Sequence, residues 1–204
     1  MRYYYHPASP NCRKVSALIE MLGIEAEFVF VDLPKGHQAK PEFLAINPNG
    51  MVPALVDGDT TVLESNCLLI YLAEKAGSPM WSEDDKLEIL RWMFWEQSHF
   101  MYATGTVFFQ RLLKPLLGQE PDQARVDEGI AKFRRHATAL DGHLADRQWL
   151  LGDAMTLADL AVAANLTYAD ACGLPVEEYP NIRRWYDAVE ALPAWQSTRP
   201  ALAG

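Results

Sequence analysis

The spacing of apolar residues changes along this 204-residue chain near residue 76. Before that point, short runs of β-prone residues alternate with helical stretches, which predicts strands and helices in turn. The expected strands are Arg2–Tyr5, Glu27–Asp32, Val52–Val56 and Thr60–Leu63, and the expected helices are Asn11–Leu22, Pro41–Ile46 and one that opens at Glu64-Ser65. A strand–helix–strand start requires a right-handed crossover and a parallel pair, and a later hairpin adds antiparallel strands. We therefore predict a mixed α/β domain over residues 1–76.

After residue 76 the apolar positions recur with helical spacing. The segment Ala76-Gly77-Ser78-Pro79-Met80 breaks both flanking helices, so we expect a linker over residues 77–83 and a second domain over 84–204. Its expected helices are 84–117, with a kink near Gly105, then 122–145, 157–171, 181–192 and a short piece after Pro193. The second domain is predicted to be all α.

Residues 49–75 carry the first functional signal. Asp57-Gly58-Asp59 lies between two β-prone runs and predicts a hairpin, and Ser65 then stands where a helix N-cap is expected. The start of a helix offers free N–H groups to an anion, and Val52-Pro53 is a candidate cis peptide that would turn the Val52 backbone toward an extended ligand. The layout fits an anionic peptide along an exposed edge, and a fragment without any ligand fits it equally well.

A second signal is Ser9-Pro10-Asn11-Cys12. Ser9 fits a helix N-cap and Pro10 the first helical position. A ligand thiolate placed there would accept hydrogen bonds from the Ser9 hydroxyl and nearby N–H groups, which lowers a thiol pKa and increases the fraction of nucleophile. The alternative is that Ser9 only caps the helix.

Composition narrows the classes of function. The formal charge is −9 with no basic cluster, which argues against a nucleic-acid partner. No stretch approaches the apolar length of a membrane span. Three cysteines form an odd number without metal-ligand spacing, which favours reduced thiols and a cytoplasmic protein over a disulfide framework or a metal site.

Several short motifs occur together and in order. They are Ser9-Pro10-Asn11-Cys12-Arg13-Lys14-Val15, Asn47-Pro48 through Val52-Pro53, Glu64-Ser65, and Thr156-Leu157-Ala158-Asp159. In this order the chain resembles the cytosolic glutathione transferase superfamily over essentially its whole length. The Ser-x-Asn-Cys-x-Lys-Val segment looks like the bacterial nu-type and related serine-containing groups.

The resemblance implies a thioredoxin-like glutathione-binding domain followed by an all-helical domain that carries a pocket for a small apolar electrophile. It implies glutathione as co-substrate, no metal, and a homodimer. It also implies site roles for seven residues. Ser9 and Asn11 would contact the sulfur, Val52-Pro53 the cysteinyl part, Glu64 and Ser65 the γ-glutamyl end, and Gln38 the glycyl end.

Some roles stay open at this point. Tyr3, Tyr4 and Tyr5 on the first strand keep a tyrosine role possible, and Cys12 is interpreted as packing. His37 and Lys40 are candidates for the glycyl carboxylate, Phe100, Tyr102 and Phe108 for the electrophile pocket, and Gln97 and His99 for contact with a neighbouring subunit's glutathione. The expected activity is conjugation, with reduction of disulfides or peroxides as a further activity. A non-catalytic interaction module of the same fold is the alternative, and a third hypothesis is a glutaredoxin-like oxidoreductase, which would require a cysteine at position 9 in place of Ser9.

Overall fold

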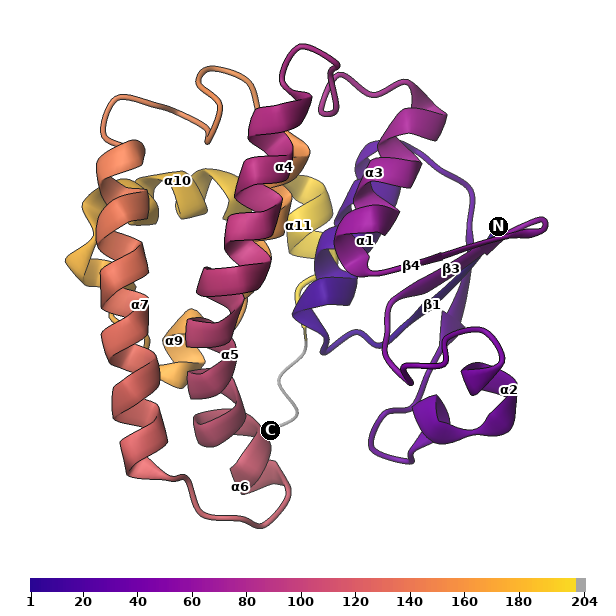
Figure 1. Ribbon diagram of the computed structural model, residues 1–204, viewed down its shortest axis with the longest axis horizontal. Coiled ribbons are helices and arrows are strands. Elements are labelled where there is room, and N and C mark those ends of the chain that lie inside the picture. Colours follow the sequence, from indigo (N-terminus) through magenta and orange to yellow (C-terminus); the bar gives the residue numbers. More distant parts are fainter. Residues whose placement is uncertain (201–204) are drawn as a thin grey trace. The chain divides into compact units, whose positions relative to one another are not determined.

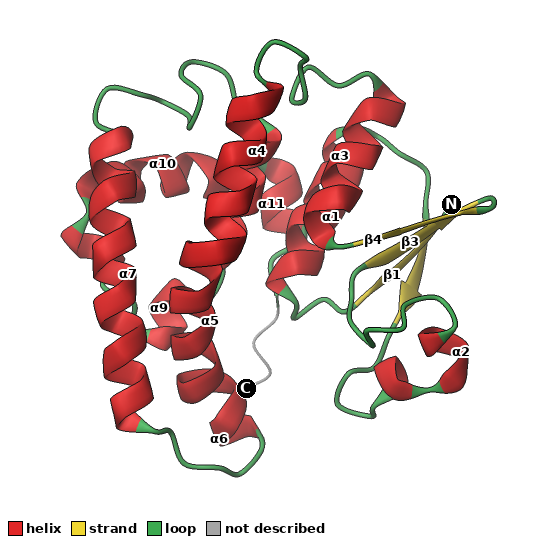
Figure 2. Ribbon diagram, in the orientation of Figure 1, coloured by secondary structure: helices red, strands yellow, loops and turns green. Residues whose placement is uncertain are grey.

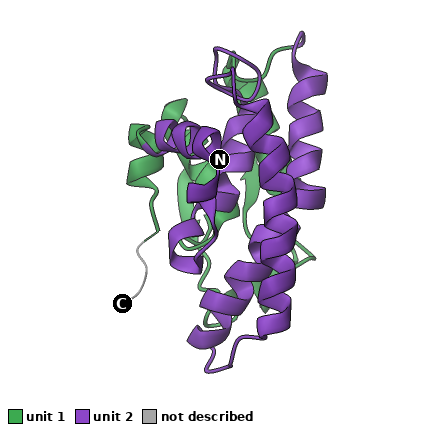
Figure 3. Cartoon of the chain, turned by 90° about the vertical axis from the view of Figure 1, so that its left-hand side faces the viewer, with its two compact units in different colours: residues 1–82, 191–204 green, residues 83–190 purple. Residues whose placement is uncertain are grey.

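The computed structural model describes residues 1–200, and the chain divides into two compact units (Figure 3). The first unit holds residues 1–82 and the chain from residue 191 onward, and the second holds residues 83–190. The sequence had assigned everything after residue 84 to the helical domain. The structure instead groups the described part of the C-terminal segment with the first unit, and residues 201–204 of the expected domain lie outside the described residues.

The first unit is built on a four-stranded sheet in the order β2-β1-β3-β4 (Figure 2). The strands are β1 (Arg2–Tyr5), β2 (Glu27–Phe30), β3 (Ala54–Asp57) and β4 (Thr60–Leu63). β1 pairs with β2 in parallel and with β3 antiparallel, and β3 pairs with β4 across the predicted hairpin. The predicted topology, a parallel crossover followed by a hairpin, is confirmed.

Alternation along β1 assigns the helices to opposite faces of this sheet. Tyr3 is fully buried, and its hydroxyl donates to the Cys12 carbonyl of α1 (Pro10–Met21). Tyr4 faces the other way and meets the Phe43 ring of α2 (Pro41–Leu44) edge-on at 6.0 Å. α3 (Ser65–Ala76) packs beside α1 (Figure 1). It ends at Gly77, whose φ of 62° is the left-handed cap that glycine adopts freely.

The last described helix, α11 (Pro193–Ser197), explains why the C-terminal segment belongs to the first unit. The Arg13 guanidinium of α1 donates to the Trp195 carbonyl at 3.0 Å and lies 4.4 Å from the centre of the Trp195 ring. Both residues are buried. The contacts of this buried cation with a carbonyl and an indole face attach the C-terminal segment to α1.

The second unit is helical, as predicted. Its first helical run contains α4 (Lys86–Trp95), α5 (Met101–Phe108) and α6 (Lys114–Leu116), joined by π-helical turns at Glu96–Phe100 and Phe109–Leu113. The irregular turns flank Gly105, which lies inside α5, so the departure from α geometry falls on both sides of the expected kink. The remaining helices are α7 (Gln123–His143), α8 (Leu157–Ala163), α9 (Ala169–Cys172) and α10 (Pro180–Glu190). Short 3₁₀ turns lie at His37–Ala39 in the first unit, and at Ala164–Leu166 and Val176–Glu178 in the second.

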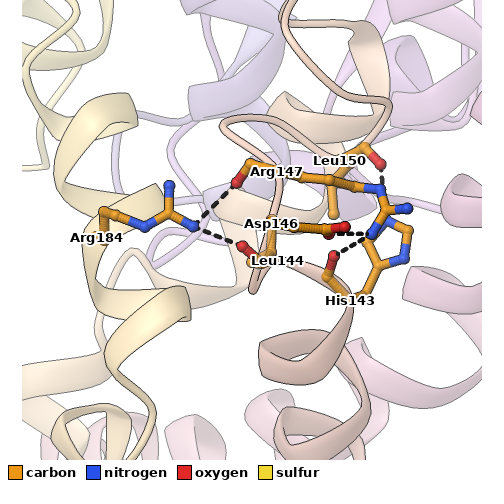
Figure 4. Close-up of polar contacts among 6 residues, drawn as sticks. All are labelled: His143, Leu144, Asp146, Arg147, Leu150 and Arg184. Carbon is orange, nitrogen blue, oxygen red and sulfur yellow. Dashed lines mark hydrogen bonds and ion pairs between the residues drawn. The ribbon is translucent and has the colours of Figure 1, made fainter.

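Two arginines satisfy the carbonyls at the end of α7 (Figure 4). Arg147 donates to the His143 carbonyl at 2.8 Å, and Arg184 from α10 donates to the carbonyls of Leu144 and Arg147 at 2.6 and 2.9 Å. The His143 ring meets the Leu150 carbonyl at 2.7 Å. The bonds to His143 and Leu144 use carbonyls at the end of α7, and those to Arg147 and Leu150 hold the turn that leads toward α8. Within residues 1–200, no helix is long and apolar enough to cross a membrane.

Candidate functional site

The predicted binding residues gather at one end of the sheet in the first unit. α1 follows the C-terminal end of β1, and α3 follows the C-terminal end of β4. Tyr4 pairs with Ala54 and Ala54 with Leu63, so the residues just before β3 lie at the same end. Two helix N-termini and one free length of backbone therefore share this edge.

Ser9 is the N-cap of α1, as predicted. Its hydroxyl oxygen accepts the N–H of Cys12 at 3.3 Å, Pro10 occupies the first helical position, and no acidic residue lies in the first turn. Ser9 is half-buried. The hydroxyl hydrogen is free to donate elsewhere, because the cap bond uses only the oxygen as an acceptor.

Asn11 connects the two helix starts. Its side-chain oxygen accepts a hydrogen bond from the Ser65 hydroxyl at 3.3 Å. With the oxygen engaged, the two amide N–H groups of Asn11 form no hydrogen bond with any residue in 1–200. The bond brings together one residue predicted to meet the sulfur and one predicted to meet the γ-glutamyl end.

The start of α3 differs from the expectation by one residue. Glu64 is the N-cap and Ser65, only 4 % exposed, is the first helical residue, so the predicted N-cap role of Ser65 is wrong. Glu64 has φ 66° and ψ 119°, which among non-glycine residues in the described chain is the single positive φ. Its side chain is exposed and makes no capping bond. Strain of this kind costs about 1–3 kcal/mol and concentrates at ligand sites.

The segment that leads into β3 leaves backbone groups open. Val52-Pro53 is cis, as the sequence predicted. The N–H and C=O of Val52 bond to no other residue within 1–200. Gln38, in the turn His37–Ala39, lies close to this segment, because a Cβ on Gly50 would come within 3.2 Å of the Gln38 carbonyl oxygen. The Gln38 side-chain oxygen is buried without a partner, which leaves an acceptor for a donor that the protein does not supply.

Comparison with known proteins decides the family. Residues 4–80 match the profile of the glutathione S-transferase N-terminal domain, and residues 123–188 match that of its C-terminal domain. Glutathione S-transferase 3 of Zea mays is 36 % identical over 99 % of this chain and 94 % of its own length. The chain belongs to the glutathione S-transferase family.

Solved structures of glutathione transferases have the same fold. Glutathione transferase F7 from Populus trichocarpa has a TM-score of 0.91 at 28 % identity and covers 97 % of this chain and 96 % of its own. Glutathione S-transferase I from maize, solved with an atrazine–glutathione conjugate, has a TM-score of 0.88 at 27 % identity and covers 97 % and 95 %. These relatives are plant proteins and give no support to the expected bacterial, nu-like subgroup.

Two residues that the sequence analysis did not assign lie beside the predicted site residues. Lys14 is fully buried, and its ammonium donates at 2.7 Å to the side-chain oxygen of Asn66, the second residue of α3. It places a positive charge between the starts of α1 and α3. His6 holds the loop before Ser9. The sequence signal for Lys14 was its place in the Ser9–Val15 motif, and for His6 its place before Pro7 at the end of a strand.

Cys12 is a packing residue, as interpreted from the sequence. It is 1 % exposed, and burial raises the pKa of its thiol to about 11, although bonds from His6, Ser9 and Tyr3 act in the opposite direction. The Tyr3 hydroxyl is likewise committed: it donates to the Cys12 carbonyl and accepts from Ser16, and burial raises its pKa well above 10.0. Tyr4 lies in the core against α2, and Tyr5 is half-buried.

The three aromatic candidates for the electrophile pocket, all in the second unit, differ in their exposure to solvent. Phe100 is fully buried between the rings of Trp95 and Phe133, so it is core. Phe108 stacks on Tyr168, half-buried. Tyr102 is exposed beneath the Lys132 ammonium and borders a hollow of about 690 Å³ with Met101, Gly105 and Phe109. Of the two polar candidates, Gln97 is half-buried, and exposed His99 stacks on His136.

No group of three or more His, Cys, Asp or Glu side chains arranged to hold a metal occurs within residues 1–200.

Proposed function

We propose that this protein is a glutathione transferase that joins the glutathione sulfur to small electrophiles. The observation that carries the proposal is the Asn11–Ser65 hydrogen bond at 3.3 Å, which joins two helix N-termini at one end of the sheet. Neither α1 nor α3 has an acidic residue in its first turn, so both starts favour an anion. Glutathione carries two carboxylates and a thiol that reacts as an anion.

The tripeptide would lie along the open backbone. Its γ-glutamyl carboxylate would take the N–H groups at the start of α3 and the Ser65 hydroxyl, and its amino group the Glu64 carboxylate. Its cysteinyl backbone would pair with the free N–H and C=O of Val52 beside Pro53, as an added strand does. The partnerless oxygen of Gln38 would accept the N–H near the glycyl end. Exposed Lys40 and half-buried His37 are further candidates for the glycyl carboxylate.

The reaction needs a thiolate, and the residues around Ser9 would favour one. The Ser9 hydroxyl and the free amide N–H groups of Asn11 would donate to the sulfur. Hydrogen bonds to the charged form lower its pKa. The buried Lys14 ammonium adds a positive field. The thiol proton leaves to solvent, the thiolate forms a carbon–sulfur bond with the electrophile, and the leaving group departs with its electron pair. Because these donors lower the thiol pKa directly, the proposed step requires no metal.

We assign residues 1–76 to glutathione binding, 77–83 to the linker and the helical unit up to residue 190 to the domain that receives an apolar electrophile. The structure of glutathione S-transferase I from maize contains an atrazine–glutathione conjugate, which supports aromatic electrophiles as a substrate class. Within the family we retain the serine-containing character, since Ser9 occupies the cap, but nothing supports a nu-like assignment. Conjugation is the activity to test first, ahead of disulfide or peroxide reduction.

We also propose a homodimer in the cytoplasm. A line of exposed apolar side chains, spaced seven or eight residues apart, runs along the second unit from α4 to α6. It consists of Leu87, Phe94, Tyr102, Phe109 and Leu116. Such a line on a monomer surface is typical of an interface. Three free cysteines are consistent with a reducing compartment. Light scattering at micromolar concentration should give twice the 23.0 kDa chain mass.

The test of function is Ser9→Ala. Most binding contacts come from Val52, Glu64 and Ser65, so glutathione affinity should stay within about twofold, while kcat should fall at least tenfold because the sulfur loses a donor. Thiolate absorbance against pH should show a higher pKa for bound glutathione. Asn11→Ala should have the same sign, and the double variant should lose more than either alone.

Two results would redirect the proposal. No retention on immobilised glutathione would favour the non-catalytic interaction module. An unaffected Ser9→Ala enzyme combined with an inactive Cys12→Ser enzyme would favour redox chemistry at the protein's own thiol.

A further inference from the structure

The loop between β1 and α1 is held by one residue, His6, at three points. Its N–H points to the Cys12 sulfur at 3.5 Å, and its carbonyl accepts the Ser9 N–H at 3.0 Å. Its ring nitrogen Nδ1 accepts the Ala8 N–H at 3.2 Å. The two residues between His6 and Ser9 therefore have little freedom, although Pro7 is exposed.

The ring bond resembles an Asx turn, in which a side-chain acceptor takes the N–H two residues ahead. Here imidazole Nδ1 replaces the oxygen of Asn or Asp. The imidazole ring also lies against the Phe30 ring, with the two centroids 5.5 Å apart and the planes inclined by 31°. Because Nδ1 accepts, the neutral ring carries its proton on Nε2.

We propose that His6 is a positioning residue that fixes the direction of the Ser9 hydroxyl through the Ala8 turn, and that it does so only as a neutral ring. This inference rests on the proposed role of Ser9 toward the glutathione sulfur. A hydroxyl that must donate to a sulfur gains from a fixed cap geometry, and the cap oxygen of Ser9 is already tied to the Cys12 N–H at 3.3 Å. A small displacement of a hydrogen-bond donor that contacts the reacting sulfur lowers the rate of the chemical step.

Protonation of the His6 ring would break the hydrogen bond between Nδ1 and the Ala8 N–H. A proton on Nδ1 would face the Ala8 N–H, so two donors would oppose each other. Burial lowers the pKa of His6 below its ordinary 6.5, and the carboxylate of Asp32 opposes that shift. Asp32 itself is engaged by the Lys35 ammonium at 2.7 Å, and the nearby Cys12 thiol is uncharged.

Protonation of His6 couples folding to pH. Since the folded pKa is lowered, the folded protein binds less proton than the unfolded chain just below pH 6.5. The contribution of His6 is fully present above pH 6.5 and is lost as pH falls through its folded pKa. The loop should loosen in acid.

The test is a double-mutant cycle with a rescue variant. His6→Leu should lower kcat about tenfold with the Michaelis constant for glutathione unchanged, since the turn is lost and the peptide contacts remain. In the Ser9→Ala background the same change should cost nothing further, because there is no hydroxyl left to position. His6→Asn should recover most of the rate, because Asn forms the same turn.

The dependence of kcat on pH is a second measurement, and a purely structural role of His6 would leave its shape unchanged. Wild-type kcat should fall in acid more steeply than the thiolate fraction of bound glutathione, and His6→Asn should track that fraction. His136→Asn is the matched control, because burial also lowers the pKa of His136 and it lies in the second unit. Its profile should match wild type.

The outcomes separate the two proposals. If His6→Leu is as harmful in the Ser9→Ala background as in wild type, or lowers only the melting temperature, the positioning role is overturned while Ser9 keeps its own. If Ser9→Ala retains full rate, the proposed function of Ser9 fails and this inference fails with it.

Discussion

Three helix starts in this chain use their first turns in two different ways. In the second unit, α8 is closed by its own sequence. Thr156 is 5 % exposed and Asp159 is fully buried. The Asp159 carboxylate accepts the Thr156 N–H at 2.8 Å, the Leu150 N–H at 2.9 Å and the Trp185 indole N–H at 2.9 Å. The Asp159 carboxylate thus bonds only to donors of the protein itself, so this helix start stabilises the fold.

In the first unit, α1 and α3 begin with similar sequences, and neither is closed by a carboxylate: Ser9 caps α1 through its hydroxyl, and Glu64 makes no capping bond at α3. Each has an asparagine at its second position and a cysteine at its third, Asn11-Cys12 and Asn66-Cys67. Neither has an acidic residue in its first turn. A carboxylate placed there, as Asp159 is in α8, would occupy the N–H groups and repel an anionic peptide. The difference between the structural start and the proposed binding starts is a carboxylate at the third helical position that bonds back to the N-cap N–H, as Asp159 does and as the exposed Glu64 N-cap does not.

The largest effect should come from breaking the closed start. Asp159→Ala would leave the N–H of Leu150 and the indole N–H of Trp185 buried without partners, and would remove the capping box. We expect a loss of about 3–5 kcal/mol in the free energy of unfolding, measured by urea denaturation. The exposed Asp170→Ala is the control. A loss below about 1 kcal/mol would show that α8 does not depend on its own carboxylate.

An open start should respond in binding more than in stability. Ser65→Ala removes the hydroxyl that joins α3 to Asn11 and a proposed contact to the γ-glutamyl carboxylate. We expect the Michaelis constant for glutathione to rise about tenfold with kcat nearly unchanged, because this contact is shared by ground state and transition state. Stability should fall by about 1 kcal/mol. Thr61→Ala, exposed on β4, is the control. Unchanged glutathione affinity would move the γ-glutamyl site elsewhere.

Glu64→Gly should move stability and binding in opposite directions. Glycine adopts φ 66° without strain, so the free energy of unfolding should rise by about 1 kcal/mol. The Michaelis constant for glutathione should rise as well, since the carboxylate is lost. Glu64→Ala separates the two effects, because it loses the carboxylate and keeps the strain. If Glu64→Gly is destabilising, the backbone at Glu64 stores no strain.

Much of the fold was predictable because it follows from local periodicity. β1 and β4 match the expected residues, α1 begins and ends within one residue of expectation, and α3 begins at the expected Glu64-Ser65. The place of α11 was not predictable. Its attachment to α1 depends on Arg13 meeting Trp195, a contact across most of the chain that no local pattern contains.

The site was predictable in its residues and less so in its connections. Motif order pointed to Ser9, Asn11 and Ser65, but their hydrogen-bond partners depend on how α1 and α3 pack. Sequence patterns favoured Ser65 as the cap, because serine is a common N-cap, whereas Glu64 holds that position with a strained backbone. His6 gave almost no signal, since a histidine replaces the Asn or Asp by which such turns are recognised.

The smallest effect should come from the thiol at the third position of α1. The Cys12 N–H bonds to the Ser9 hydroxyl oxygen, yet burial raises the pKa of the Cys12 thiol to about 11, so at neutral pH it stays a thiol and is a poor nucleophile. Cys12→Ala should therefore leave kcat within about twofold between pH 6 and pH 8, and cost about 1 kcal/mol of stability as a lost packing group. Conjugation rates and urea denaturation measure the two effects. Cys172→Ala is the matched control, because burial raises the pKa of Cys172 to about 12 in the second unit. A large loss of rate in Cys12→Ala alone would mean that the open start of α1 acts through the protein's own sulfur as well as the ligand's.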